Sequence, residues 1–171
     1  MFTRHAVIST DQIADVILVA ADDAIIGLYF PQHWTKPDVA GFGELVELDS
    51  DPVLSIAATQ LHEYLVGQRR QFDFAMTTAG TPFEERVWAI LRETPFGETT
   101  TYGEIAEQLG DRSLARIVGQ AVGHNPLSIF VGCHRVVSKD GKLTGYAGGL
   151  ERKEFLLGLE EPELVKAGKL F

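Results

Sequence analysis

A cysteine and a histidine stand side by side at the end of an apolar stretch, as Cys133 and His134 in LSIFVGCHRVV. An adjacent basic ring can lower the pKa of a thiol and supply the thiolate that nucleophilic substitution needs. Neighbouring side chains on a regular strand point to opposite faces, so the pair can cooperate only if the backbone bends or a water bridges them. Lone cysteines are mostly small buried residues. The residues alone therefore leave both packing and catalysis open.

The composition limits the kind of protein. One cysteine excludes an intramolecular disulfide framework and a multi-cysteine zinc site. A chain of 171 residues that is 45% hydrophobic can bury a core, as one domain or as two small packed domains. No apolar run approaches the roughly 18 residues that cross a bilayer, and the start lacks the pattern of a signal peptide. We therefore expect a cytoplasmic protein with no membrane contact.

The formal net charge of −9 disfavours non-specific nucleic-acid binding, because phosphate contacts need lysine and arginine. The charge is unevenly spread, however. Between residues 112 and 153 the only acids are Asp140 and Glu151, whereas the bases are Arg112, Arg116, Arg135, Lys139, Lys142, Arg152 and Lys153. A local basic face is compatible with this stretch.

The first 76 residues have the pattern of a small α/β unit. Two strand-like runs, 15–20 and 25–30, flank an Asp-Asp turn and predict a hairpin. Asp51 and Pro52 are a helix cap and a first-turn proline, and they predict a helix to about Gly67. In QFDFAM, residues 71–76, apolar side chains alternate, which predicts a half-buried strand.

The second half is mainly helical in pattern. Thr81 and Thr101 each start a capping box, and a third helix is expected near Asp111. Its predicted core face consists of Leu114, Ile117, Val118, Ala121 and Val122. The break at Gly110 suggests a helix-turn-helix. The apolar run 127–137 that follows predicts a buried strand leading into Cys133.

A ridge of small residues lies on the other face of the third predicted helix. It consists of Ala115, Gly119 and Gly123, and Arg116 stands beside it. Such a ridge allows close approach of another helix or of a narrow DNA minor groove, and the pattern does not choose between them.

The segment GCHRVVSKDGKLTGYAGGLERKEFLL resembles the active-site signature of the O6-alkylguanine-DNA alkyltransferases, bacterial type. The resemblance continues upstream through TPFEERVWAILRETPFGETTTYGEIAEQLG and ARIVGQAVGHNP and covers about residues 81–160. It implies a ribonuclease-H-like α/β domain over residues 1–76 and a mainly α, winged helix-turn-helix domain over residues 77–171. It also implies single-turnover direct-reversal DNA repair, in which Cys133 takes the alkyl group irreversibly from O6-alkylguanine, with O4-alkylthymine as a further substrate.

The resemblance assigns catalytic roles residue by residue. Cys133 is the acceptor, and His134 draws its proton through a water. Glu160 orients the histidine, Asn125 is a hinge bordering the pocket, and Tyr146 protonates or hydrogen-bonds the leaving base. On the residues alone, Glu160 is a surface acid, Asn125 a turn cap and Tyr146 a packing residue.

The same resemblance implies how DNA and the damaged base are held. Arg116 fills the gap left by the extruded nucleotide, and Tyr102 crowds its 3′ phosphate. The recognition helix carries Ala115, Gly119 and Gly123. The guanine pocket is expected to involve Val136, Ser138, Ala147 and Gly148. Arg135 is expected to brace the loop.

The sequence departs from the family pattern at two positions near the site. Gly132 replaces the usual proline, which removes a fixed φ angle and adds a backbone donor. Ser128 falls where mammalian members have a proline, and a small residue there resembles bacterial members that accept bulkier adducts. We therefore expect a looser active-site loop and a roomier alkyl pocket.

Two alternative functions make different demands on the sequence. A lesion-binding module like the alkyltransferase-like proteins would lack the cysteine, and a Cys-His hydrolase would need an oxyanion-hole motif that the sequence does not offer. The resemblance implies no metal and no organic cofactor. Its implied partner is double-stranded DNA carrying O6-alkylguanine, bound by a monomer that can act cooperatively along the duplex.

Overall fold

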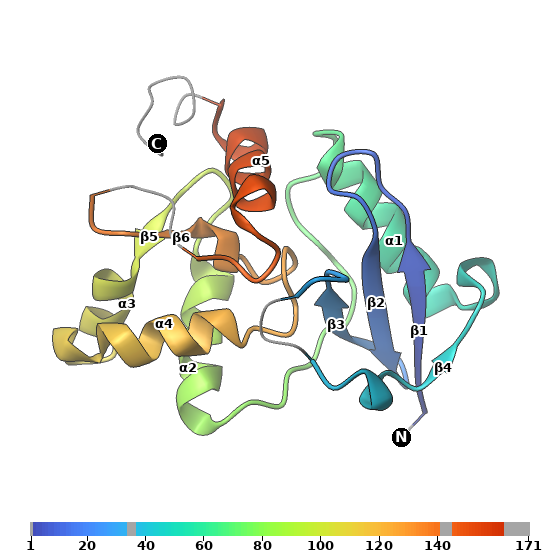
Figure 1. Cartoon of the computed structure of the whole chain (residues 1–171), viewed down its shortest axis with the longest axis horizontal. Helices are drawn as coiled ribbons and strands as arrows, with labels where there is room; N and C mark the ends of the chain where they lie inside the picture. Colours follow the sequence, from blue (N-terminus) through green and yellow to red (C-terminus); the bar gives the residue numbers. More distant parts are fainter. Residues whose placement is uncertain (1, 34–36, 141–144, 163–171) are drawn as a thin grey trace.

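The computed structural model describes residues 2–33, 37–140 and 145–162. Figure 1 shows a sheet with one helix on one side of the molecule and the remaining helices on the other. Lys142, one of the bases counted above, lies outside the described residues. Within the described ranges, no helix is both long enough and apolar enough to cross a lipid bilayer.

The first half of the chain forms a mixed four-stranded sheet. Its strands are β1 (Thr3–Ile8), β2 (Val16–Ala21), β3 (Ala24–Tyr29) and β4 (Glu44–Leu45). Their order is β3-β2-β1-β4, with β1 antiparallel to β2, β2 antiparallel to β3, and β4 parallel to β1. The predicted hairpin is confirmed as β2 and β3.

Helix α1 (Pro52–Leu65) packs on this sheet. Two short 3-10 helices, η1 (Val39–Phe42) and η2 (Leu48–Ser50), precede it. The Asp51 side chain accepts a hydrogen bond from Leu54 N, 3.1 Å, and also pairs with Arg4 Nε, 2.6 Å. The predicted cap is therefore confirmed, and the same carboxylate ties the helix to β1.

The second half contains four α-helices among the described residues. They are α2 (Pro82–Glu93), α3 (Tyr102–Gln108), α4 (Ala115–Gly123) and α5 (Leu150–Glu160). Strands β5 (Thr100–Thr101) and β6 (Val136–Val137) form a short parallel pair beside them. Both predicted capping boxes are present, at Thr81 and Thr101, and η3 (Arg112–Leu114) leads into α4. Buried Trp88 on α2 donates its indole N–H to Ala121 O on α4, 2.8 Å.

Three sequence predictions were wrong. Residues 71–76 form no strand, because apart from one bridge at Met76 they find no partner; Phe72 and Phe74 instead pack edge-on against Phe130. Residues 127–135 are buried but irregular, ending in η4 (Cys133–Arg135) before the short β6. Ile117 is 42% exposed, because only Val118, Ala121 and Val122 of α4 reach the core fully.

The two halves share one hydrophobic core. A single cluster of buried residues runs from the sheet through α1, α2 and α4 to α5. Backbone contact also crosses between them, because Leu28 N on β3 donates to Pro126 O, 2.8 Å. Arg152 on α5 donates to Ile13 O, 2.8 Å, with its guanidinium carbon 4.7 Å from the centre of the Phe30 ring. The sheet therefore packs against the segment that carries Cys133.

Candidate active site

Cys133 lies in the wall of a cavity of about 230 Å³ between α3, α4 and the irregular segment that follows α4. The residue is 4% exposed. The residues that share this cavity with it are Tyr102, Gly119, Val122, Gly123, Asn125, Ser128, Gly145, Tyr146 and Ala147. The cavity therefore brings together residues expected for catalysis, for the pocket and for DNA contact.

The irregular backbone turns Cys133 and His134 in a way that a strand would not. Gly132 has φ −70° and ψ 58°, and Cys133 then begins the short helix η4. Of the two arrangements expected from the sequence, a bent backbone or a bridging water, the structure shows a bent backbone at this pair. The φ of Gly132 is one that proline adopts, but an added Cβ would meet Arg135 Cδ at 2.9 Å. The backbone at residue 132 could thus accept the proline that is usual in the family, but the proline ring would be crowded by Arg135.

Asn125 holds the segment in place. Its side-chain N–H group donates to Val131 O, 2.9 Å, and its side-chain oxygen accepts from Leu127 N, 3.0 Å. Both bonds are buried, so this amide closes the loop between α4 and Cys133. The hinge role expected for Asn125 stays a prediction, and these two hydrogen bonds are the contacts through which it would act.

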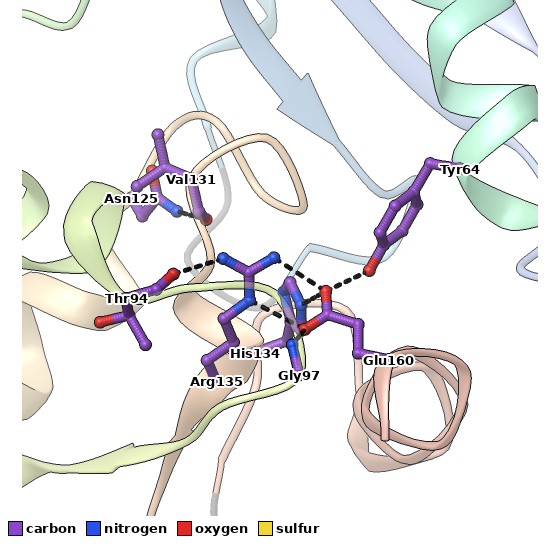
Figure 2. Close-up of polar contacts among 8 residues, drawn as sticks. All are labelled: Tyr64, Thr94, Gly97, Asn125, Val131, His134, Arg135 and Glu160. Carbon is purple, nitrogen blue, oxygen red and sulfur yellow. Dashed lines mark hydrogen bonds and ion pairs between the residues drawn. The ribbon is translucent and has the colours of Figure 1, made fainter. Parts of the chain in front are cut away.

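Glu160 is the centre of a buried hydrogen-bond network (Figure 2). His134 Nε2 lies 2.7 Å from Glu160 Oε2, and Arg135 donates to both oxygens, from Nε at 2.8 Å and from Nη2 at 3.0 Å. Gly97 N adds a bond of 3.3 Å. Arg135 also donates to Thr94 O, 2.7 Å, and so braces the loop as expected.

The network determines which histidine nitrogen carries the proton. Burial alone would raise the pKa of Glu160, but the hydrogen bonds and charges of His134 and Arg135 outweigh it and hold that pKa well below its usual range. An ionised carboxylate only accepts, so His134 Nε2 must donate. Burial lowers the pKa of His134 and so favours the neutral ring, whereas Glu160 acts in the opposite direction. Its Nδ1 lone pair is then free to accept a proton, and it has no hydrogen-bond partner among the described residues.

The Cys133 thiol does not have the lowered pKa that its neighbour suggested. Burial raises the pKa of Cys133, and the nearby Asn125, Lys153 and Ser128 offset that effect only in part. The resting group is therefore a thiol rather than a thiolate. Its reaction requires a base that takes the proton as the new bond forms.

Several residues expected in the site lie elsewhere. Val136 is buried in β6, where its carbonyl accepts a hydrogen bond from Lys153 Nζ, 2.6 Å. Ser138 hydrogen-bonds Asp140 outside the cavity. Gly148 lies under the Phe30 ring, where an added Cβ would come within 2.5 Å of the ring. Ala115 and exposed Arg116, which are expected to contact DNA and not to line the pocket, lie on α4 and are not among the residues that line the cavity.

Among the described residues of the basic stretch, 112–140 and 145–153, the bases do not form a continuous basic face. Lys153 is fully buried, Arg135 is paired with Glu160, and Arg152 folds over Phe30. Arg112 is exposed but pairs with Glu107, 3.0 Å. Arg116 and Lys139 are exposed bases of this stretch.

Sequence reasoning missed two buried polar residues at the site. Tyr64, on α1, donates to Glu160 Oε2, 2.6 Å. Lys153, one turn into α5, is 0% exposed, and burial lowers its pKa to about 8. Tyr64 fits the apolar stripe of its helix, which indicates burial but not the partner of its hydroxyl.

Lys153→Met should change stability with pH in a defined direction. In the unfolded chain the lysine pKa is 10.5, and in the fold it is about 8. The buried amine therefore costs nothing above pH 10.5, and its cost grows as the pH falls to 8, where it reaches about 3 kcal/mol. Denaturant unfolding should show that the free energy of unfolding of the variant, relative to that of the wild type, is more favourable at pH 8 than at pH 10. An equal difference at both values would contradict the assignment.

Comparison with known proteins places this site in a family. Residues 82–162 match the family model described as "6-O-methylguanine DNA methyltransferase, DNA binding domain". A methylated-DNA--protein-cysteine methyltransferase of Mycolicibacterium paratuberculosis is 53% identical over 143 residues, which cover 84% of each chain. The chain belongs to the 6-O-methylguanine DNA methyltransferase family.

Solved structures of this family have the same fold. The O6-methylguanine methyltransferase of Mycobacterium tuberculosis is 38% identical, with a TM-score of 0.81 over 94% of both chains. A structure of OGT from the same organism in complex with DNA gives a TM-score of 0.82, also at 38% identity, over 93% of both chains. The sheet-and-helix arrangement described above is thus shared with the M. tuberculosis protein.

Proposed function

We propose that this protein repairs alkylated DNA by direct reversal, transferring the alkyl group of O6-alkylguanine irreversibly to Cys133. The observation that carries the proposal is the placement of Cys133 in the cavity wall, with the adjacent His134 bound to Glu160. Membership of the methyltransferase family supports the same activity. Each molecule acts once.

In the proposed reaction the Cys133 sulfur attacks the alkyl carbon attached to O6. The S–C bond forms as the C–O6 bond breaks, and the electron pair of that bond goes to guanine. The thiol proton passes through a water to His134 Nδ1, and Glu160 stabilises the imidazolium. Tyr146, whose buried hydroxyl has no hydrogen-bond partner among the described residues, supplies the proton or hydrogen bond that the leaving guanine needs.

The proposed partner is double-stranded DNA with the damaged base turned out of the helix into the cavity. The M. tuberculosis structure with DNA supports this partner. Tyr102 and Gly119 lie next to each other in the cavity lining. The proposed recognition helix, α4, would therefore lie at the opening of the cavity. We retain the division into a ribonuclease-H-like domain, 1–76, and a winged helix-turn-helix domain, 77–171, as part of the proposal.

Intact-mass analysis tests the activity. The protein is mixed with a duplex containing O6-methylguanine and, as a control, with the same duplex carrying guanine. One added methyl group on the peptide that holds Cys133 is the expected result. Unmodified protein that binds the lesion tightly would contradict transfer and favour the lesion-binding alternative.

Arg116→Ala should separate base extrusion from chemistry. Arg116 is exposed on α4 and lies outside the cavity lining, so the chemistry at Cys133 does not need it. We expect repair of duplex to slow about tenfold or more, the scale of a lost 1–3 kcal/mol contact, while reaction with free O6-benzylguanine is unchanged. Arg86→Ala, which removes the same exposed side chain from α2, is the matched control. Equal losses on duplex and free base would refute the extrusion role.

A further inference from the structure

Tyr64 reaches the catalytic network from the opposite half of the molecule. It stands on α1, next to the sheet, and its hydroxyl donates to Glu160 Oε2 on α5 across 96 positions of sequence, at 2.6 Å. Figure 2 shows it approaching Glu160 from the side opposite Arg135. Its side chain is 0% exposed. The Tyr64 ring packs against two aromatic rings, and its centroid lies 5.4 Å from that of Phe72 and 6.2 Å from that of Phe96.

The hydroxyl is not needed to satisfy the carboxylate. Glu160 already receives His134, two donors of Arg135 and Gly97 N, which match the roughly four acceptor positions of a carboxylate. Tyr64 adds a fifth donor. It places that donor on Oε2, the same oxygen that holds His134.

We infer that Tyr64 is a positioning residue of the transfer reaction, through which the N-terminal half sets the basicity of His134 by sharing its carboxylate partner. The inference rests on the proposed function. It gives the N-terminal half a part in the chemistry. Tyr64 acts through Glu160 and is not among the residues that line the cavity.

The sign of the effect follows from the shared oxygen. A hydrogen bond from Tyr64 withdraws negative charge from Oε2, which weakens the stabilisation of a protonated His134. Removing it leaves more charge facing the ring, so the pKa of His134 rises. The other charged groups acting on His134 are Arg135 and Lys153, and both disfavour its protonated form. Arg135 also acts electrostatically on Tyr64, and the substitution changes neither Arg135 nor Lys153.

The test is the pH dependence of Cys133 alkylation in Tyr64→Phe. Phenylalanine keeps the ring and its contacts with Phe72 and Phe96, so the variant should fold. Because His134 must be neutral to accept the proton, the acid-side midpoint of the rate should move upward by about half a pH unit or more. Tyr29→Phe is the matched control, since Tyr29 lies in the same half and stacks on Phe42 without bonding Glu160. Its midpoint should equal that of the wild type.

Two reagents separate this inference from the proposed function. Methyl transfer from the O6-methylguanine duplex measures the repair reaction, and carbamidomethylation by iodoacetamide reports Cys133 without DNA. If the wild type takes no methyl group, the proposed function fails, yet the iodoacetamide profile still tests Tyr64. A uniform rate loss without a midpoint shift, or equal shifts in the Tyr64 and Tyr29 variants, would overturn the inference.

Discussion

Cys133→Ser should abolish methyl transfer while leaving binding to the lesion duplex intact. Serine fits the space of the thiol, which is 4% exposed, so the fold and the cavity should persist. Its hydroxyl is a far weaker nucleophile than a thiol deprotonated by His134. We expect the rate to fall at least about a thousandfold, the scale on which loss of a catalytic nucleophile acts.

Two measurements on the same sample check this result. Intact mass after incubation with the O6-methylguanine duplex should stay that of the unmodified protein, and fluorescence anisotropy of labelled duplex should give the wild-type affinity. A methyl group found on the variant would remove Cys133 from its proposed role. Lost binding together with lost transfer would show that the substitution damages the cavity.

Glu160→Gln should damage both stability and reaction. The amide keeps the size of the carboxylate but removes its charge, and it turns an N–H group toward one of the buried donors, Arg135 or His134. Breaking a buried ion pair at one partner costs about 3 kcal/mol or more. Transfer should slow about a hundredfold, because the imidazolium loses its counter-charge.

The stability loss should depend on pH with a known sign. The pKa of Glu160 is lower in the fold than its unfolded value of 4.5. Ionised Glu160 therefore stabilises the fold fully above pH 4.5, and this stabilisation is lost as the pH falls below 4.5. Denaturant melts of wild type and variant should therefore differ most at neutral pH and converge in acid. Glu151→Gln, an exposed acid on the same helix, should change stability by less than about 0.5 kcal/mol. A constant difference down to pH 2 would contradict an ionised Glu160.

Local chemistry made the helices predictable. The caps at Asp51, Thr81 and Thr101 each combine a side-chain acceptor with a first-turn pattern, and all three start helices in the structure. The run 127–137 was mispredicted because continuous burial looks the same for a strand and for a coil packed between layers. Strand β1 went unpredicted, although Ala6 and Ile8 alternate on its buried face.

The active site was predictable only for residues that are adjacent in sequence or belong to the family motif. Cys133 and His134 are adjacent, and the family motif carries Asn125, Tyr146 and Glu160 with them. Tyr64 and Lys153 differ, because their role depends on which distant group their polar ends reach once they are buried. Hydrophobic periodicity predicts that such a position is covered. It does not predict the partner.

The hydrogen bond between Trp88 and α4 gives the protein an intrinsic optical reporter. The indole is buried and fixed to the carbonyl of Ala121, on the helix proposed to lie against DNA. Indole emission responds to changes in polarity and hydrogen bonding around the ring. Docking of a duplex on α4 can therefore be followed by tryptophan fluorescence in stopped flow, without a label, and compared with the time course of Cys133 methylation.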